Sequence, residues 1–290
     1  MWILYAFGSA FFAGITSILA KLGISKTDST LATAIRTIVV VIFAWLMVWL
    51  TGSFGQLYSI SNKTFLFLIL SGLSTGASWL CYFRALQKGP ASQVVAVDKS
   101  STVITIVLSF ILLHETVSSY SVIGTILIAA GTFLMLDPNP FAAKQKSRNF
   151  DSSSWLFAAA GSALFASLSA IFGKIGIDQI DSNLGTAIRT MVVLVMAWLM
   201  VFIQKKQKWI SQIPKKELGF ILASGLATGA SWLCFFKALH MGPASAVVPI
   251  DKLSILVTIL FSVLVLHEKL SAKSWTGLLI LIAGTLLMLL

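Results

Sequence analysis

Six charged side chains lie inside long apolar stretches of this chain. On insertion scales an ionisable residue at the centre of a membrane-spanning helix costs about 2.5 to 3.5 kcal/mol, so such residues usually mark a functional site or an internal partner. Four of the six are basic and two are acidic, and the net positive charge favours an anionic or carboxylate-bearing ligand. They form two sets: Arg36, Asp98 and Lys99, then Arg189, Asp251 and Lys252.

Each aspartate is followed directly by a lysine. Adjacent residues on a helix diverge by about 100°, so Asp98 and Lys99 do not both point along one line into the protein. One arrangement pairs each aspartate with an arginine of its own or the opposite half and leaves the lysines facing a cavity. The alternative is a permanent ion-pair brace between helices that never contacts a ligand.

Aromatic residues and glycines recur close to these charges. The aromatic residues could stack on an amphipathic solute, although ordinary packing explains them equally well. Paired glycines one turn apart allow close helix crossing, and each Gly-Pro pair ends one helix and starts the next. The aromatic candidates are Trp79, Tyr82, Trp232 and Phe235, and the packing or hinge candidates are Gly72, Gly76, Gly89, Pro90, Gly225, Gly229, Gly242 and Pro243.

Enzyme motifs are missing from the sequence. His114-Glu115 continues as Thr-Val-Ser and His267-Glu268 as Lys-Leu-Ser, so neither completes the H-E-x-x-H pattern of a metalloprotease. No phosphate-binding Gly-rich loop followed by Lys-Ser or Lys-Thr occurs. We therefore predict a protein that is not an enzyme and has no metal or cofactor. The His-Glu pairs could couple transport to protons or cap helix ends.

A tandem duplication determines which segments of the chain position these residues. Residues 1–137 and 154–290 are identical at roughly half their positions when shifted by 153 residues, without an insertion. Mean hydropathy is +0.93, with 57% apolar and 11% charged residues, where soluble domains have about a quarter charged. The chain is therefore predicted to be an integral membrane protein. A polar linker at 138–153 separates the two repeats.

Each repeat divides into five apolar runs of about 20 residues, the length that crosses a bilayer as a helix. The prediction is thus an all-α polytopic protein with ten membrane-spanning helices. The expected spans are 2–20, 31–50, 64–86, 92–113, 119–136, 155–173, 184–203, 218–239, 245–266 and 272–290.

The odd number of spans per repeat determines the relation between the halves. A second five-span unit fused directly to the first must enter the membrane from the opposite face, so the repeats are inverted, as in many secondary transporters. Of the 21 Lys and Arg residues, fourteen then fall on the linker side, three on the other side and four within spans. This bias predicts a cytoplasmic linker and both termini outside. It also accounts for the basic excess without nucleic-acid binding.

Several motifs resemble the EamA family of the drug/metabolite transporter superfamily, and the resemblance covers both repeats. They are Ala-Ile-Arg-Thr at 34–37, Trp-Leu-Cys-(Tyr/Phe)-Phe-(Arg/Lys)-Ala-Leu at 79–86 and 232–239, Gly-Pro-Ala-Ser at 89–92 and 242–245, and His-Glu at 114–115 and 267–268. The resemblance implies export of amino acids, other small metabolites or drugs through a central cavity between the halves. Ten-span family members are usually drawn with both termini inside, which is opposite to the charge count.

The sequence therefore predicts a secondary active transporter that exports a small metabolite, such as an amino acid or organic anion, by alternating access. Its partners would be a small-molecule substrate and the lipid bilayer of a bacterial inner membrane. The fused repeats would form an internal pseudo-dimer that acts as a monomer. Alternatives are a multidrug or cation efflux carrier, a passive channel and a non-transport membrane scaffold.

Loop charge provides a first test of the orientation. The loop at 51–63 has one lysine, whereas its copy at 204–216 has five, Lys205, Lys206, Lys208, Lys215 and Lys216. Exchanging the charges of these loops should disturb insertion, because positive loops are retained in the cytoplasm. Protease accessibility of a terminal tag would measure this. An unchanged orientation would contradict the charge-based assignment.

Overall fold

The computed structural model describes residues 1–24, 26–88, 97–98, 100–116, 118–135, 152–254, 256–257, 260 and 272–288, and the regular structure in these ranges is helical. The first half contains α1 (Trp2–Gly23), α2 (Ser29–Leu50), the 3₁₀ helix η1 (Ser53–Ser59), α3 (Asn62–Lys88), α5 (Ser101–Leu112) and α6 (Ser119–Met135). The second contains α7 (Ser152–Gly176), α8 (Ser182–Ile203), the 3₁₀ helix η3 (Lys206–Gln212), α9 (Lys215–Met241), α10 (Ala244–Lys252) and α12 (Ala272–Leu287).

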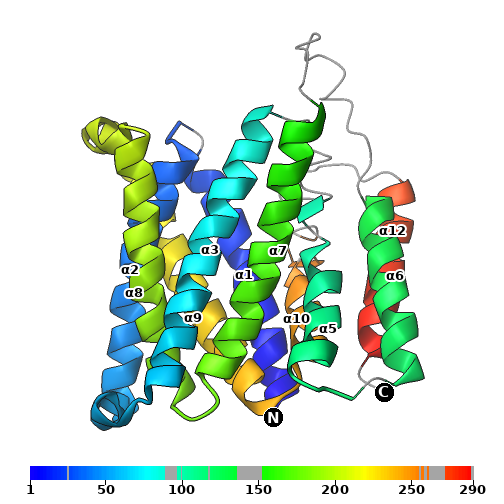
Figure 1. The fold of residues 1–290 in the computed structure, drawn as a ribbon. Helices are drawn as coiled ribbons and strands as arrows, with labels where there is room; N and C mark the ends of the chain where they lie inside the picture. The colour runs from blue at the N-terminus through cyan, green and yellow to red at the C-terminus, as the bar shows by residue number, and fades with distance from the viewer. Residues whose placement is uncertain are drawn as a thin grey trace.

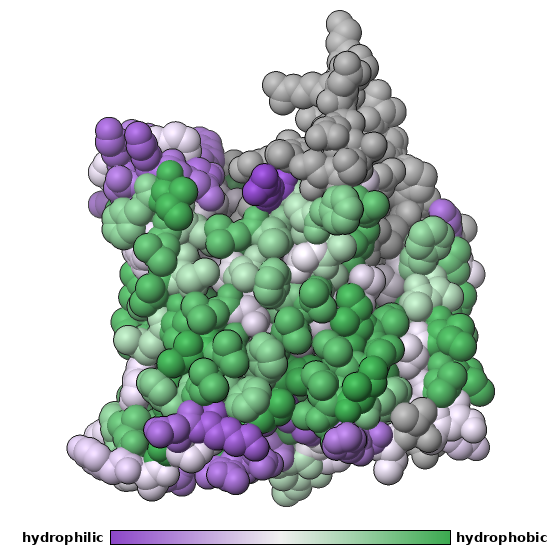
Figure 2. Space-filling view, viewed as in Figure 1, coloured by the Kyte–Doolittle hydropathy of each residue, from purple (hydrophilic) through white to green (hydrophobic). Residues whose placement is uncertain are grey.

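Each of the ten predicted spans overlaps one of these α-helices, although α5 and α10 cover only parts of the spans predicted at 92–113 and 245–266, whose remaining residues are largely outside the described ranges. Six of them, α1, α2, α3, α7, α8 and α9, are long and apolar enough to cross a membrane. Shorter apolar helices occupy the positions of three further spans, at α5, α6 and α12. Figure 2 shows a broad apolar band across the middle of the face in view, with polar residues gathered above and below it. The predicted all-α polytopic fold is confirmed.

The second helix of each half starts at an aspartate. Asp28 Oδ1 accepts hydrogen bonds from the backbone N–H groups of Thr30 and Leu31 at 3.0 and 3.2 Å. Its copy Asp181 accepts one from Asn183 at 3.0 Å at the start of α8. Such side chains satisfy backbone donors that a helix start leaves unpaired. The aspartate that follows each first span is therefore the N-cap of the second helix.

The two halves run in opposite directions through the apolar band. In Figure 1, α1 starts at the face where both chain termini lie, and α7 starts at the opposite face. We call these the terminal face and the linker face, because α6 ends and α7 begins at the second of them. Most of the predicted 138–153 linker, residues 138–151, lies outside the described residues. The inverted repeat predicted from an odd number of spans is thus observed.

The first helix of each half packs mainly against the opposite half. The most extensive helix contacts join α7 to α3 and α1 to α9. Further contacts add α5 and α8 to the first pair, and α2 and α10 to the second. We call these groups unit A (α3, α5, α7, α8) and unit B (α1, α2, α9, α10). Neither unit is a repeat, since each contains helices from both halves.

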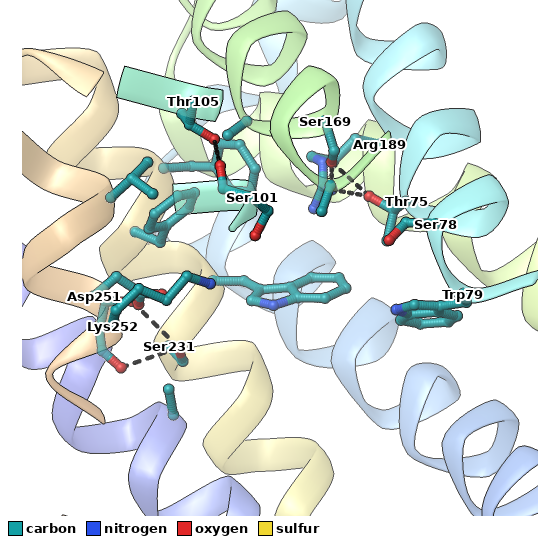
Figure 3. A pocket seen from close by; sticks show the side chains of 18 residues that line it. Thr75, Ser78, Trp79, Ser101, Thr105, Ser169, Arg189, Ser231, Asp251 and Lys252 are labelled. Carbon is teal, nitrogen blue, oxygen red and sulfur yellow. Dashed lines mark hydrogen bonds between the residues drawn. The ribbon is translucent and has the colours of Figure 1, made fainter. Parts of the chain in front are cut away.

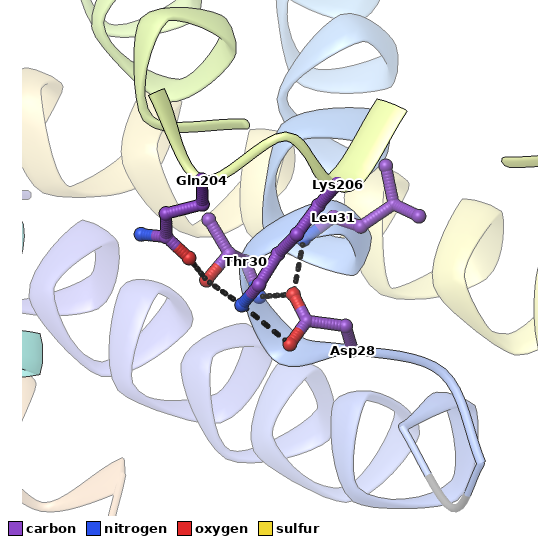
Figure 4. A network of polar contacts seen from close by, with 5 residues as sticks. All are labelled: Asp28, Thr30, Leu31, Gln204 and Lys206. Carbon is purple, nitrogen blue, oxygen red and sulfur yellow. Dashed lines mark hydrogen bonds and ion pairs between the residues drawn. The ribbon is translucent and has the colours of Figure 1, made fainter. Parts of the chain in front are cut away.

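Units A and B meet mainly along two helix pairs, α2 with α8 and α5 with α10, and α8 also contacts α9. The α2–α8 pair is tied at both faces. At the linker face, Lys206 Nζ lies 2.6 Å from Asp28 Oδ2, and Thr30 donates to Gln204 at 3.3 Å (Figure 4). At the terminal face, the Asp181 N–H donates to Gln56 Oε1 at 2.8 Å. Contacts at both ends hold this pair together.

Glycines allow the closest helix approaches. A Cβ added at Gly72 or Gly76 would lie 2.6 or 2.7 Å from side chains of α8, and one added at Gly225 or Gly229 would lie 2.7 or 2.6 Å from side chains of α2. The last helices of the halves also pack together, as Figure 1 shows for α6 and α12. Gly131 is critical there, because its Cβ would meet the backbone of α12 at 2.6 Å.

Replacing Gly131 with Ala should lower the free energy of unfolding by about 1 to 3 kcal/mol, because backbone atoms of α12 must move. Gly219→Ala is the matched control, since Gly219 is exposed in α9 with no atom within 4 Å of the added Cβ. It should be neutral or slightly stabilising. Thermal unfolding in detergent measures both. Equal melting temperatures for the two variants would contradict the close α6–α12 contact.

Candidate functional site

A central cavity of about 260 Å³ lies between units A and B (Figure 3). Both halves of the chain contribute to its wall, with hydroxyl groups, aromatic rings and three charged side chains. The charged lining residues are Arg189, Asp251 and Lys252. The hydroxyl-bearing ones are Ser9, Thr75, Ser78, Ser101, Thr105, Ser169 and Ser231, and the aromatic ones are Trp79, Trp232, Phe235 and Phe236.

Arg189 of α8 is held by neutral oxygens from unit A. Its Nε donates to Ser71 Oγ at 3.1 Å, and its Nη2 donates to Thr75 Oγ1 at 2.6 Å and Ser169 Oγ at 3.1 Å. Ser71 and Thr75 are four residues apart and so share one face of α3. Hydrogen bonds that a membrane helix cannot obtain from lipid are supplied here by neighbouring helices.

Two aromatic rings of unit B complete the surroundings of this arginine. Its guanidinium carbon lies 5.0 Å from the centroid of the Trp232 ring and 4.5 Å from that of Phe236. Such contacts are worth about 2 kcal/mol or more when desolvated. Arg189 is only 3% exposed. A buried cation is thus stabilised by hydroxyl groups and ring faces, with no carboxylate among its described partners.

Arg36, the copy of Arg189 in the first half, has a different environment. It is half-buried and does not line the cavity. Among the residues that the structure describes, it has no hydrogen bond or ion pair. Thr228 and Thr16, the copies of Thr75 and Ser169, contact each other at 3.3 Å without a hydrogen bond from Arg36. Arg36 and Arg189 occupy equivalent positions in the two repeats, but the fold places only Arg189 at the cavity.

The aspartates are bound by serines, and the predicted Asp–Arg ion pairs are not formed in the described part of the chain. Ser9 Oγ donates to Asp251 Oδ1 at 2.5 Å, and Ser231 Oγ donates to the Ser9 carbonyl at 3.1 Å. The prediction failed because α1, which packs against the second half, places its own donor, Ser9, beside the aspartate. Arg189 faces α3 and α7 instead.

The same arrangement recurs in the other unit. Ser162 Oγ donates to Asp98 Oδ1 at 2.6 Å, and Ser78 Oγ donates to the Ser162 carbonyl at 3.0 Å. Ser9 and Ser162 are repeat copies, as are Ser78 and Ser231. Sequence reasoning missed these serines. Their recurrence at copied positions within apolar spans was the available signal.

Lys252 and Asp251 both border the cavity, so the expectation that a lysine faces it holds for the second copy. Figure 3 places them on the opposite side of the cavity from Arg189, Thr75 and Ser169. Lys99, the first copy, lies outside the described residues, as do Gly89 and Pro90. Gly242 and Pro243 are described, and they precede α10 directly.

Three of the four predicted aromatic residues, Trp79, Trp232 and Phe235, line the cavity. Tyr82 is elsewhere, half-buried against Ala85 and Ala159. Among the described residues, no three His, Cys, Asp or Glu side chains come together as a metal site would require. The cavity therefore offers hydrogen bonds, ring faces and charge.

Comparisons with known proteins add a family match. The sequence model described as the EamA-like transporter family matches residues 1–137 and 153–290. A Sinorhizobium sp protein named "Uncharacterized transporter in cobO 3'region" is 46% identical over 137 residues, which are 47% of this chain and 97% of that protein. It has the length of one repeat.

A solved structure described as "Crystal structure of protein" shares the fold. Its TM-score is 0.82 at 16% sequence identity, over 99% of this chain and 96% of that one. At this identity the likeness concerns the fold alone. It extends over both repeats and their inverted arrangement.

The serine–aspartate contacts can be tested by a double-mutant cycle. Ser9→Ala should lower the free energy of unfolding by about 1 to 3 kcal/mol, because Asp251 loses a buried donor. In the Asp251→Asn background the same change should cost less, which gives a coupling energy. Ser17→Ala is the control, since exposed Ser17 donates only to Ala13 of its own helix. Additive effects of Ser9→Ala and Asp251→Asn would contradict the contact.

Proposed function

Because this chain belongs to the EamA-like transporter family, we propose that it is a secondary active transporter that exports a small carboxylate-bearing metabolite, such as an amino acid or another organic anion. The chain is a transporter by family, and the substrate class, direction and mechanism are our proposal. The observation that carries it is the environment of Arg189.

Arg189 is a cation at the cavity wall with no carboxylate partner among the described residues. Removing a charge from water costs several kcal/mol unless it is paired. Three hydroxyl oxygens and two ring faces offset part of this cost, and their dipoles leave a full positive charge beside the cavity. A ligand carboxylate would supply the missing countercharge, and Arg binds carboxylates in a bidentate geometry.

Charge and size of the cavity support the same substrate class. Its lining contains two cationic side chains, Arg189 and Lys252, and one anionic side chain, Asp251. The net positive charge attracts anions and disfavours simple organic cations. The volume of about 260 Å³ is below the roughly 300 to 1,000 Å³ typical of drug-sized sites. A small metabolite therefore suits it better than the substrates of a multidrug carrier.

The polar and aromatic walls divide the cavity. Hydroxyl groups from α3, α5 and α7 lie on one side, and Trp232 and Phe235 of α9 provide apolar surface. An ammonium group could reach Asp251 while a carboxylate contacts Arg189, since Figure 3 places these charges on opposite sides. Zwitterionic amino acids combine both groups in one small molecule.

For the transport cycle we propose alternating access, with the cavity between units A and B opening to one face at a time. Inverted repeats around a central site are typical of such carriers. The α2–α8 pair, tied at both faces, would be the axis about which the units rotate. The Lys and Arg bias supports termini outside the cell, and coupling to protons or another ion would drive export.

Transport by the purified chain tests the proposal. In proteoliposomes with an imposed pH gradient, we expect saturable, gradient-dependent flux of amino acids or organic anions and little flux of cationic drugs. Flux that does not saturate would indicate a channel. Saturable flux of cations alone would favour the multidrug alternative. No flux of any solute tested would favour a scaffold.

Arg189 and Arg36 provide a matched pair of substitutions. Arg189→Gln should raise the half-saturating substrate concentration about tenfold or more, since a lost charge-assisted hydrogen bond is worth about 1.5 to 3 kcal/mol. Arg36→Gln should have a much smaller effect, because Arg36 does not line the cavity. Equal effects of the two substitutions, in variants with wild-type melting temperatures, would contradict the assigned role of Arg189.

A further inference from the structure

Glu115 joins units A and B at the terminal face. It follows α5, which belongs to unit A, and its carboxylate accepts hydrogen bonds from the first two residues of α10, which belongs to unit B. The Ala244 N–H donates to Oε1 at 2.6 Å and the Ser245 N–H to Oε2 at 2.9 Å. A carboxylate at this position satisfies free backbone donors and interacts with the positive end of the helix dipole.

Lys174, in the last turn of α7, strengthens this contact. Its Nζ lies 3.4 Å from Glu115 Oε1, and it also donates to the Gly242 carbonyl just before α10. Lys174 belongs to unit A and Gly242 to unit B, so this lysine is a second link between the units. Both side chains are mostly buried, at 11% exposed for Glu115 and 23% for Lys174.

The backbone before Glu115 is held in an uncommon conformation. His114 has a φ of +52°, in the left-handed region that is unfavourable for a non-glycine residue. This turn follows α5 and directs the chain so that the Glu115 carboxylate reaches α10. Such a local conformation persists only where the surrounding contacts stabilise it.

Glu115 is well suited to remain charged. Partial burial opposes its ionisation, but the hydrogen bonds from Ser245 and Ala244 and the charge of Lys174 outweigh burial and lower the pKa of the carboxyl. The contact therefore persists at neutral pH. It is a specific charged link rather than an incidental polar one.

The position of this link relative to the cavity suggests its role. Val248 of α10 and Thr105 of α5 line the cavity. Val248 is four residues, about one helical turn, after Ala244, and α5 continues past Thr105 toward the terminal face. The α5–α10 contact therefore lies between the cavity and the terminal face. Glu115 and Lys174 hold it at its terminal end.

We propose that Glu115 and Lys174 form a gate latch, which keeps the cavity closed toward the terminal face by holding α10 of unit B against α5 and α7 of unit A. The inference rests on the proposed alternating-access function and adds the residues that control one face. Opening toward the terminal face requires the latch to break, because α10 cannot separate from α5 while Glu115 caps it. The α2–α8 pair can stay closed throughout.

Accessibility of a cavity cysteine to a membrane-impermeant maleimide tests the latch without measuring transport. The full chain, with Cys81→Ala and Cys234→Ala, would carry Ala166→Cys as the reporter, because Ala166 lines the cavity. The reagent is added at the terminal face of proteoliposomes, where orientation is scored by cleavage of an N-terminal tag. Glu115→Gln and Lys174→Met should each raise the labelling rate at least threefold.

Two controls separate the latch from general loosening. Lys63→Met removes an exposed lysine that borders the same surface hollow as Lys174, and it should leave the labelling rate unchanged. Glu268→Gln changes the repeat copy of Glu115 and should not raise labelling from the terminal face. Ala13→Cys, at the repeat copy of Ala166, provides a second reporter in the cavity wall.

Wild-type labelling rates in both Glu115→Gln and Lys174→Met, with unchanged melting temperatures, would overturn the latch. An increase that Lys63→Met reproduces would also overturn it. If one latch variant fails to fold, the other still decides, because the two act through different residues. Faster labelling in a chain that transports none of the solutes would sink the proposed function and leave the latch standing. Normal transport without faster labelling would overturn the latch and leave the proposed function standing.

Discussion

The packing of each first helix against the opposite half is the contact on which the rest of this structure depends. In lipid the hydrophobic effect does not drive helices together, so association relies on close packing and internal polar contacts. The α1–α9 and α3–α7 pairs provide both, with serine hydroxyl groups bonded across helices. Because of this exchange, neither half can bury its own polar groups alone. The two halves therefore share a hydrophobic core that contains residues of both.

The exchange also explains the polar chemistry of the cavity. Asp251 is satisfied by Ser9 from the other half, and Asp98 by Ser162. The aspartates are thus hydrogen-bonded to serines, and Arg189 has no acidic partner in the described structure. A cation supported by hydroxyl groups and aromatic rings is well placed to bind a carboxylate, because it is held in position before the ligand arrives. Preorganisation of this kind reduces the entropy cost of binding.

A duplicated sequence does not give a symmetric molecule. Arg189 lines the cavity and donates three hydrogen bonds through Nε and Nη2, whereas Arg36 makes none in the described part of the chain. The α2–α8 pair is tied at both faces, and the α5–α10 pair by Glu115 at the terminal face. In the alternating-access cycle that we propose, equivalent residues of the two repeats would take different roles in a given state.

Sequence alone determined the membrane class, the ten helical segments, the inverted repeat and the family. These follow from local or one-dimensional properties: the length of apolar runs, the shift of 153 residues and the odd number of spans. The sequence also identified Arg189, Asp251 and Lys252 as cavity candidates, because a charge in lipid requires a partner. It could not identify those partners. Asp251 has Ser9 as its partner, 242 residues away, and only the packing of α1 against the second half creates that pair. The difference between Arg189 and Arg36, and the use of Glu115 to cap α10, likewise depend on which helices touch, and the pattern that the two repeats share contains no information about that choice.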